Sequence, residues 1–166
     1  MSMNYGDDSP LEPAIMRDRN WPCLRQFGVF MENRVGRLHD VLRQVEKHDL
    51  QVIGLSIVDS IDYVVARFIL SDYERGRELF ELSTFTVFEN DVIGVVLPDS
   101  DQPFLDICTA LLQAEVNIHY SYPLLFRPRG RGAIALLTDD VDQGLRALAE
   151  KGHKLVTEKD LLDEQY

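Results

Sequence analysis

The sequence predicts an α+β protein built from two tandem modules, each with the element order β-α-β-β-α-β. Strand-like and helix-like apolar patterns alternate in that order over residues 23–90, and the same order returns over residues 91–158. Apolar positions of the first half also coincide with apolar positions of the second at a spacing that is constant from the first strand to the hairpin. Four strands and two helices in this order form an antiparallel sheet with both helices on one face, the ferredoxin-like arrangement.

The first module begins with a strand-length apolar run that ends in a polar turn. After the turn, apolar residues recur at positions i, i+3, i+4 and i+7 from Leu38, which is the buried stripe of a helix about three turns long. Two runs rich in β-branched residues then predict a hairpin, and Ser71-Asp72 provides an N-cap for a second helix. The predicted strands are 24–31, 52–61, 63–70 and 85–88. The first predicted helix carries its apolar stripe over 38–45 and ends around His48-Asp49, and the second spans 73–82.

The second module follows the same plan. Pro103 suits the first turn of a helix, Asp101 is a candidate cap before it, and Thr138-Asp139 is predicted to cap the second helix. Cys108 lies in the apolar stripe of the first helix and is predicted to be a core thiol. The predicted strands are 92–97, 116–125, 133–137 and 154–157, and the predicted helices are 103–111 and 141–148.

The two halves also match in detail, which predicts a duplication. Gly28 corresponds to Gly94 and Val41 to Ile107, and we call the spacing that these two pairs share the repeat spacing. Beyond the hairpin it becomes longer by a single position, as an insertion in a loop would produce. Modules of this size bury little surface alone and leave edge strands open, so we expect a homodimer.

The ends of the chain fall outside the two modules. Residues 1–22 hold three prolines among many polar residues and predict an irregular arm, whose end Trp21 could pin to the body. Residues 159–166 predict an acidic tail.

Composition limits the partners. The 166 residues carry a formal net charge of −11, which would repel phosphate backbones, so no nucleic acid partner is expected. Neither a signal peptide nor a membrane-spanning apolar run is recognisable, so we expect a cytoplasmic protein that does not enter a membrane. Cys23 and Cys108 are too far apart in sequence for a Cys-x-x-Cys site or a disulfide framework.

The turn after the first strand has the chemistry of a small-molecule site. A helix begins there, and its unpaired N–H groups and partial positive charge suit a carboxylate. Gly36 allows close approach, Asn33 offers a donor and an acceptor, and Arg34 and Arg37 add positive potential. Leu38 or Ile53 could contact an aliphatic side chain. The alternative is that Asn and Gly serve only the turn conformation.

Other polar groups give weaker signals. The corresponding turn of the second module holds Asp99, Asp101, Gln102 and Pro103, which predicts a weak or dead carboxylate site with divalent-cation binding as an alternative. The four histidines lack metal-ligand spacing, and no nucleophile–base pair is evident. We therefore expect no metal, no cofactor and no catalytic residues.

The first module resembles a known family in the stretch from Phe30 to Leu38, Phe-Met-Glu-Asn-Arg-Val-Gly-Arg-Leu, followed by apolar residues at 41, 42, 45, 52 and 55. This pattern is similar to that of the ACT domain, and within it to the small regulatory subunit of acetolactate synthase. The resemblance implies amino-acid binding and regulation of a metabolic enzyme. It also implies ligand contacts at Asn33 and Gly36, and a third at Gln51, where the family has asparagine.

The sequence thus predicts an amino-acid-binding regulatory protein without its own catalysis. The residues expected at its ligand site are Asn33, Arg34, Val35, Gly36, Arg37, Leu38, Gln51 and Ile53. Three alternatives stay open: a regulatory subunit that docks on a catalytic subunit such as that of acetolactate synthase, a ferredoxin-like enzyme, and a dimeric scaffold without a ligand.

Overall fold

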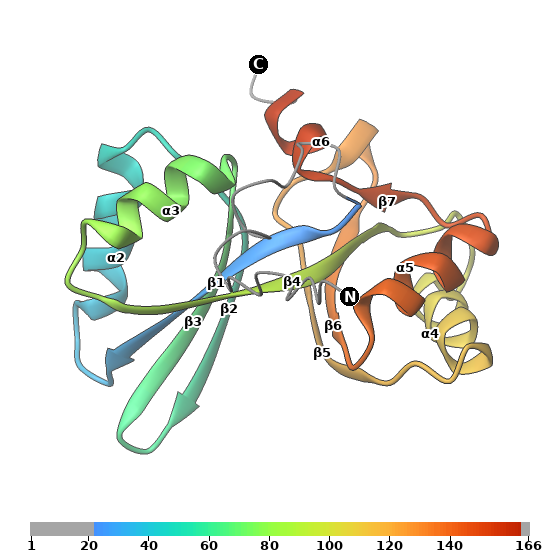
Figure 1. Ribbon diagram of the computed structural model, residues 1–166, viewed down its shortest axis with the longest axis horizontal. Helices are drawn as coiled ribbons and strands as arrows, with labels where there is room; N and C mark the ends of the chain where they lie inside the picture. Colours follow the sequence, from blue (N-terminus) through green and yellow to red (C-terminus); the bar gives the residue numbers. More distant parts are fainter. Residues whose placement is uncertain (1–21, 164–166) are drawn as a thin grey trace, which may run out of the picture.

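The computed structural model describes residues 22–163, which form two lobes joined by two long strands (Figure 1). The first lobe contains β1 (Leu24–Glu32), α2 (Arg37–Lys47), β2 (Val52–Ser60), β3 (Tyr63–Leu70), α3 (Tyr73–Glu81) and the start of β4 (Thr86–Val96). The rest of β4 begins the second lobe, which continues with α4 (Pro103–Gln113), β5 (Ile118–Pro123), a short 3-10 turn η1 (Pro128–Gly130), β6 (Ala133–Thr138), α5 (Val141–Glu150), β7 (Leu155–Val156) and α6 (Glu158–Asp163). The element order expected from the sequence is confirmed.

One strand, β4, belongs to both modules. Its first half pairs with β1, from Phe30 opposite Thr86 to Leu24 opposite Val92. Its second half, from Ile93, pairs with β6 on one side and with β7 on the other. The described sheet therefore runs β2-β3-β1-β4-β6-β5 with β7 beside β4, and all these pairs are antiparallel.

The two modules have the same internal topology. In each, the first strand lies between the third and fourth strands, and the second strand lies at the edge. The first helix of each module even ends in the same way, because Asp49 and Glu115, which correspond at the repeat spacing, both adopt positive φ, at 55° and 57°. The fold is therefore a pair of ferredoxin-like modules with helices on one face of each sheet, as the sequence predicts.

Three hydrophobic clusters hold the structure together. One lies beneath α2 and α3, around Phe27 and Phe68, and a second lies beneath α4 and α5, around Ile93 and Leu136. Because successive strand residues point to opposite faces, the other face of the sheets supplies the third cluster, where Leu24 and residues of both modules meet. The two lobes are thus joined by a shared strand and by a buried apolar junction.

A polar network lies inside this junction. The buried Gln26 side chain donates from Nε2 to the Tyr120 hydroxyl at 2.8 Å and to Asn90 Oδ1 at 2.9 Å. The Tyr122 hydroxyl donates to Gln26 Oε1 at 2.5 Å. Burial raises the pKa of Tyr122, with Tyr120 adding to the shift and Arg67 opposing it. The network satisfies a buried amide and links β1 and β4 to β5 across the junction.

Several local expectations were wrong. The sequence predicts separate strands at 85–88 and 92–97, whereas a single strand runs through both, so the expected boundary between residues 90 and 91 falls inside β4. The cap of α5 is Asp140, whose side chain accepts from Gln143 N, and not Thr138-Asp139. Gln102, not Asp101, precedes α4. The expected acidic tail begins as helix α6, whose Leu161 is buried in the junction.

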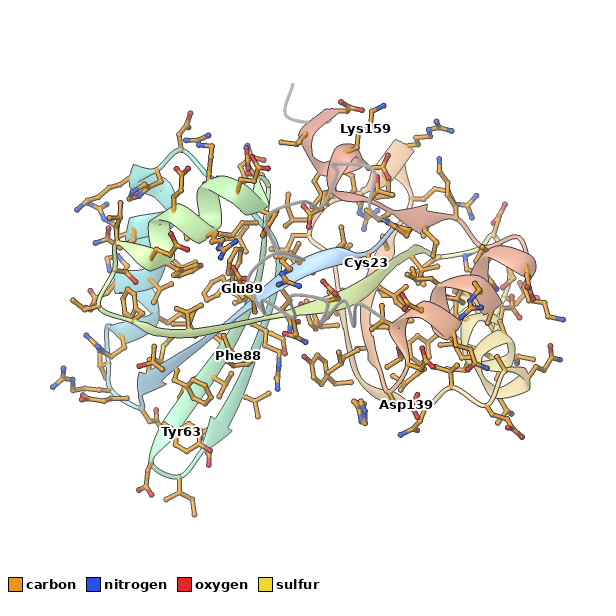
Figure 2. All side chains as sticks on the ribbon, viewed as in Figure 1. Cys23, Tyr63, Phe88, Glu89, Asp139 and Lys159 are labelled. Carbon is orange, nitrogen blue, oxygen red and sulfur yellow. The ribbon has the colours of Figure 1, made fainter. Side chains whose placement is uncertain are left out.

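The N-terminal arm and Trp21 lie outside the described residues, apart from Pro22. Figure 2 shows Cys23 where the two lobes meet and Tyr63 at the hairpin end of the first sheet. Within residues 22–163, no helix is long and apolar enough to cross a membrane.

Candidate functional site

The predicted ligand turn connects β1 to α2 and has the geometry that its glycine allows. Gly36 precedes α2 with φ 91°, a left-handed conformation that favours glycine, and a Cβ built there would meet nothing within 4 Å. The turn is exposed: Val35 points fully into solvent, and Asn33 Nδ2 donates to Asp59 Oδ1 at 3.1 Å. The open space above Gly36 leaves the start of α2 accessible to a small molecule.

A hollow of about 260 Å³ lies beside this turn, and we call it the first corner pocket. It forms where β1 ends and where β3 and β4 begin, because antiparallel strands bring these three positions to one end of the sheet. Its lining residues are Phe30, Met31, Glu32, Arg37, Asp62, Tyr63, Thr84, Phe85 and Thr86.

The lining of the first corner pocket combines both charges with aromatic surface. The guanidinium of Arg37 lies 5.8 Å from the centre of the Phe85 ring, and one of its terminal nitrogens is 3.8 Å from Asp40. Its Nε is buried and has no hydrogen-bond partner among the described residues. The acidic residues Glu32 and Asp62 line the same hollow. A molecule with one anionic and one cationic group would find partners for both here.

The structure brings together only part of the predicted site. The exposed turn consists of Asn33, Arg34, Val35 and Gly36. Within it, Arg34 forms an ion pair with Glu32 at 3.5 Å. Arg37 is the predicted residue that also lines the first corner pocket. Leu38 packs against the core of the first module.

The other two predicted residues lie away from the turn. Gln51 precedes β2, where its backbone N–H donates to Ser71 Oγ, whereas Asn33 contacts Asp59 near the far end of that strand. Ile53 is buried in the apolar junction between the modules. Neither residue reaches the first corner pocket.

The sequence reasoning missed the residues that β3 and β4 contribute to the pocket. Asp62, Tyr63, Thr84 and Phe85 carry no motif of their own. They could have been found from the predicted topology, because the starts of the third and fourth strands must lie beside the end of the first.

The second module has a hollow of about 210 Å³ in the corresponding place, which we call the second corner pocket. At the repeat spacing, Val96, Leu97 and Pro98 take the places of Phe30, Met31 and Glu32. Its charges differ from those of the first corner pocket. Asp99 is accompanied by Arg131, which precedes β6, and by His153 and Lys154, which precede β7. The acidic turn seen in the sequence is therefore only one wall of this hollow.

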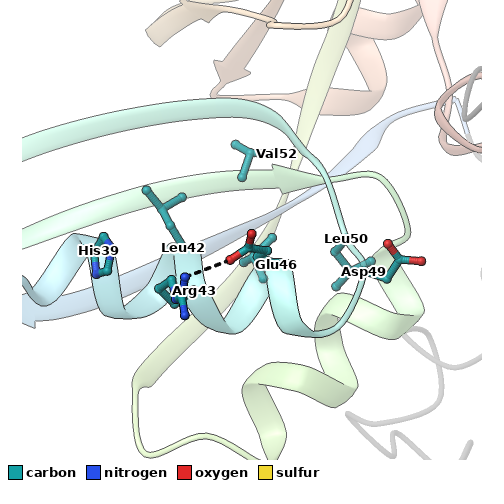
Figure 3. A pocket seen from close by; sticks show the side chains of 8 residues that line it. His39, Leu42, Arg43, Glu46, Asp49, Leu50 and Val52 are labelled. Atoms are coloured by element: carbon teal, nitrogen blue, oxygen red, sulfur yellow. Dashed lines mark ion pairs between the residues drawn. The ribbon is translucent and has the colours of Figure 1, made fainter.

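A third hollow, of about 400 Å³, is the side groove between α2 and the start of β2 (Figure 3). Its rim is polar, with Arg43 3.5 Å from Glu46 and with His39 and Asp49 at its two ends. Leu42, Leu50 and Val52 supply the apolar part of its lining. None of the residues predicted for the ligand site lines it.

The titratable groups of the described chain do not gather into a metal site. No group of three or more His, Cys, Asp or Glu side chains that could hold a metal ion occurs within residues 22–163. The clearest perturbed carboxyl is Glu158, at the start of α6, which accepts from the Arg25 backbone N–H at 2.7 Å. Its pKa is raised to about 7, mainly by burial, with Asp72 and Asp91 adding to the rise and Arg25 opposing it.

The structure therefore defines a pair of ferredoxin-like modules with small hollows at equivalent corners. The sequence profile of the family described as ACT domain pair matches residues 23–164, and the chain belongs to this family. The fold and family parts of the predicted resemblance are confirmed, while the likeness to a subunit of acetolactate synthase stays a prediction.

Solved structures agree with this assignment. Protein BT0572 from Bacteroides thetaiotaomicron is 25% identical, with a TM-score of 0.76 over 84% of this chain and 96% of its own. The ligand-free regulatory subunit of aspartate kinase from Thermus thermophilus is 12% identical, with a TM-score of 0.56 over 76% of this chain and 91% of its own, and it shows the fold alone. No curated protein sequence matches the chain.

Proposed function

We propose that this protein is an amino-acid-binding regulatory protein whose ligand occupies the first corner pocket, next to the turn at Gly36. The observation that carries the proposal is the charge pattern of that pocket, because one arginine, Arg37, and two acidic residues, Glu32 and Asp62, line the same partly aromatic hollow. A free amino acid has the complementary pattern, a carboxylate and an ammonium on one carbon atom.

Arg37 is the proposed carboxylate ligand. Its Nε is buried without a partner among the described residues, and a buried donor left unpaired costs free energy that a bound anion would recover. The start of α2 adds the partial positive charge of a helix N-terminus on the same side of the ligand. Asn33 and Arg34 lie on the turn where they can complete the enclosure once a ligand is present.

The proposed ligands of the ammonium group are Glu32 and Asp62. The ligand's side chain would lie against the apolar surface of Phe30, Met31 and Phe85. A volume of about 260 Å³ suits a single amino acid rather than a peptide. The protein acts without catalysis of its own in this proposal, as a cytoplasmic homodimer that changes its assembly or its contacts when the ligand binds.

The test is thermal unfolding of the purified protein with each of the twenty amino acids. A ligand that binds only the folded state raises the midpoint by an amount that grows with the logarithm of its excess over Kd. Arg37→Met should weaken the binding of the active amino acid about 10- to 100-fold, because it removes a charge-assisted hydrogen bond. The matched control is Arg43→Met on the same helix, whose side chain is exposed and paired with Glu46.

If no amino acid shifts the midpoint of the folded protein, the sensor proposal fails. The regulatory subunit that docks on a catalytic subunit, such as that of acetolactate synthase, and the ligand-free scaffold would then be the hypotheses to pursue. Co-purification of a large catalytic chain from native extract would separate those two.

A further inference from the structure

The second corner pocket has an excess of positive charge in a chain that is acidic as a whole. Arg131 and Lys154 line it together with His153 and a single carboxylic acid, Asp99. The three segments that meet there hold more basic than acidic residues, namely Arg127, Arg129, Arg131, Lys151 and Lys154 against Asp99, Asp101 and Glu150. Because the chain has a net charge of −11, a local excess of the opposite sign marks a place where an anion is attracted.

The two basic side chains reach the pocket from opposite flanks of β4. Near the end of that strand, Val96 N donates to the Lys154 carbonyl at 2.8 Å, and Leu97 N donates to the Gly132 carbonyl at 2.9 Å. The segments that lead into β7 and β6 therefore border β4 on its two sides, and their backbones are about 10 Å apart, which is twice the spacing of neighbouring strands. Arg131 and Lys154 thus belong to different walls of the hollow.

Neither cation is neutralised within the described part of the chain. Five arginines of the first module form ion pairs: Arg25, Arg34, Arg37, Arg43 and Arg77. Arg131 instead donates from a terminal nitrogen to the Leu97 carbonyl at 3.2 Å, which keeps its guanidinium beside the pocket. Between residues 22 and 163, neither Arg131 nor Lys154 forms an ion pair, even with Asp99 in the same lining. A bound anion would supply the charge that both lack.

The repeat shows that this arrangement is particular to the second module. The first corner pocket takes its arginine from the start of α2, and at the repeat spacing Pro103 stands in place of Arg37. At the longer spacing beyond the hairpin, Gly152 replaces the aromatic wall at Phe85, and Lys154 has a valine as its counterpart. The lining of the second corner pocket contains no Phe, Tyr or Trp. Its ligand is therefore selected by charge more than by apolar contact.

We propose that the second corner pocket is a separate binding site for a small dicarboxylate, with one carboxylate held by Arg131 and the other by Lys154. A guanidinium can pair with both oxygens of a carboxylate, and an ammonium provides a compact positive charge. The volume of about 210 Å³ lies below the range of drug-sized ligands and limits the occupant to a molecule of a few carbon atoms. The site goes beyond the proposed function, because other residues hold the zwitterion there.

Two kinds of molecule have this chemistry, a simple dicarboxylic acid and an acidic amino acid. Asp99 separates them, because its carboxylate would attract the ammonium of an amino acid and repel a ligand that has only carboxylates. Comparing succinate with L-aspartate therefore identifies the source. If L-aspartate binds more tightly and Asp99→Asn removes the difference, the ligand is an acidic amino acid; if succinate binds more tightly, it is a dicarboxylic acid.

Isothermal titration calorimetry of the full-length chain tests the site. We expect the tighter of the two dicarboxylates to bind about 10- to 100-fold more weakly to Arg131→Met and to Lys154→Met, because each variant loses a charge-assisted hydrogen bond. Both side chains are exposed, so the thermal midpoint without ligand should stay that of the wild type. The matched control is Lys151→Met, which removes the same charge at an exposed position outside the lining and should leave binding nearly unchanged.

Three results would overturn the inference. The first is that neither dicarboxylate binds to the wild type. The second is that either Arg131→Met or Lys154→Met leaves the binding unchanged. The third is that inorganic phosphate binds as tightly as the dicarboxylates, because a single anionic group would then be sufficient.

Amide NMR separates this site from the first corner pocket. Succinate should shift the resonances of Leu97, Gly152 and Lys154, and these shifts should persist in Arg37→Met. Dicarboxylate shifts confined to residues around Gly36 would refute this inference and leave the proposed function standing. A dicarboxylate bound at the second pocket of a chain whose first pocket takes no amino acid would refute the proposed function alone.

Discussion

Glu158 makes the stability of this protein depend on pH near neutrality. Its carboxylate is partly buried at the start of α6, where it accepts a hydrogen bond from the Arg25 backbone. Its pKa is raised from 4.5 to about 7, chiefly because burial disfavours the ionised form; Asp72 and Asp91 add to the rise, and the hydrogen bond and charge of Arg25 oppose it.

The sign of the effect follows from proton linkage. Between pH 4.5 and about 7 the folded protein holds a proton on Glu158 that the unfolded chain releases, so rising pH lowers stability across this window. Below the window both states are protonated and the group contributes nothing. Above the window the folded protein bears the full free-energy cost of burying an ionised carboxylate. At 1.36 kcal/mol per unit, the shift corresponds to at most about 3 kcal/mol.

Urea unfolding of the wild type and of Glu158→Gln at pH 5 and pH 8 measures this cost. The variant keeps an acceptor for the Arg25 N–H and cannot ionise, so its stability relative to wild type should increase by about 2–3 kcal/mol between the two pH values. Glu150→Gln, at an exposed position near the end of α5, is the control and should show no such pH-dependent difference. A constant difference between wild type and Glu158→Gln at both pH values would refute the reasoning.

Two further substitutions test the packing that joins the modules. Gly94→Ala would place a Cβ 2.6 Å from Leu24 Cδ1 and 3.0 Å from Val156 Cβ. We therefore expect the free energy of unfolding in urea to fall by about 1–3 kcal/mol. An unchanged urea midpoint would mean that this packing is loose. Tyr122→Phe removes the donor to Gln26 Oε1 and should cost about 1–3 kcal/mol by the same measurement, whereas a neutral result would mean that the amide finds another partner.

The fold could be predicted from the sequence because its signals are local and repeated. Helical stripes, β-branched runs and the cap at Asp72 depend on neighbouring residues, and the duplication supplied each signal twice. The shared strand was missed because a local pattern shows where apolar residues lie but not whether the chain turns between them. Residues Glu89, Asn90 and Asp91 look like a turn, yet they stay in the ladder, where Asp91 pairs with Arg25 and Asn90 with Gln26.

The site could be predicted only where it is continuous in sequence. The turn at Asn33 to Gly36 has a recognisable composition, and the structure places it at the end of β1 beside a hollow. The opposite wall comes from Asp62 and Phe85, which are separated from the turn by more than a strand and contribute through tertiary structure alone. Ile53 was expected to contact an aliphatic side chain of the ligand, but it is buried in the apolar junction between the modules, and the pairing of β2 shifts register between Val52 and Gly54.

The two modules keep one backbone and differ in the charges that they present at equivalent places. The first corner pocket carries one arginine and two carboxylates, while the second sets Arg131 and Lys154 against a single aspartate. The outer side of the first helix is charged in the first module and apolar in the second. Because the two modules share their element order and strand pairing, these differences reside in the side chains.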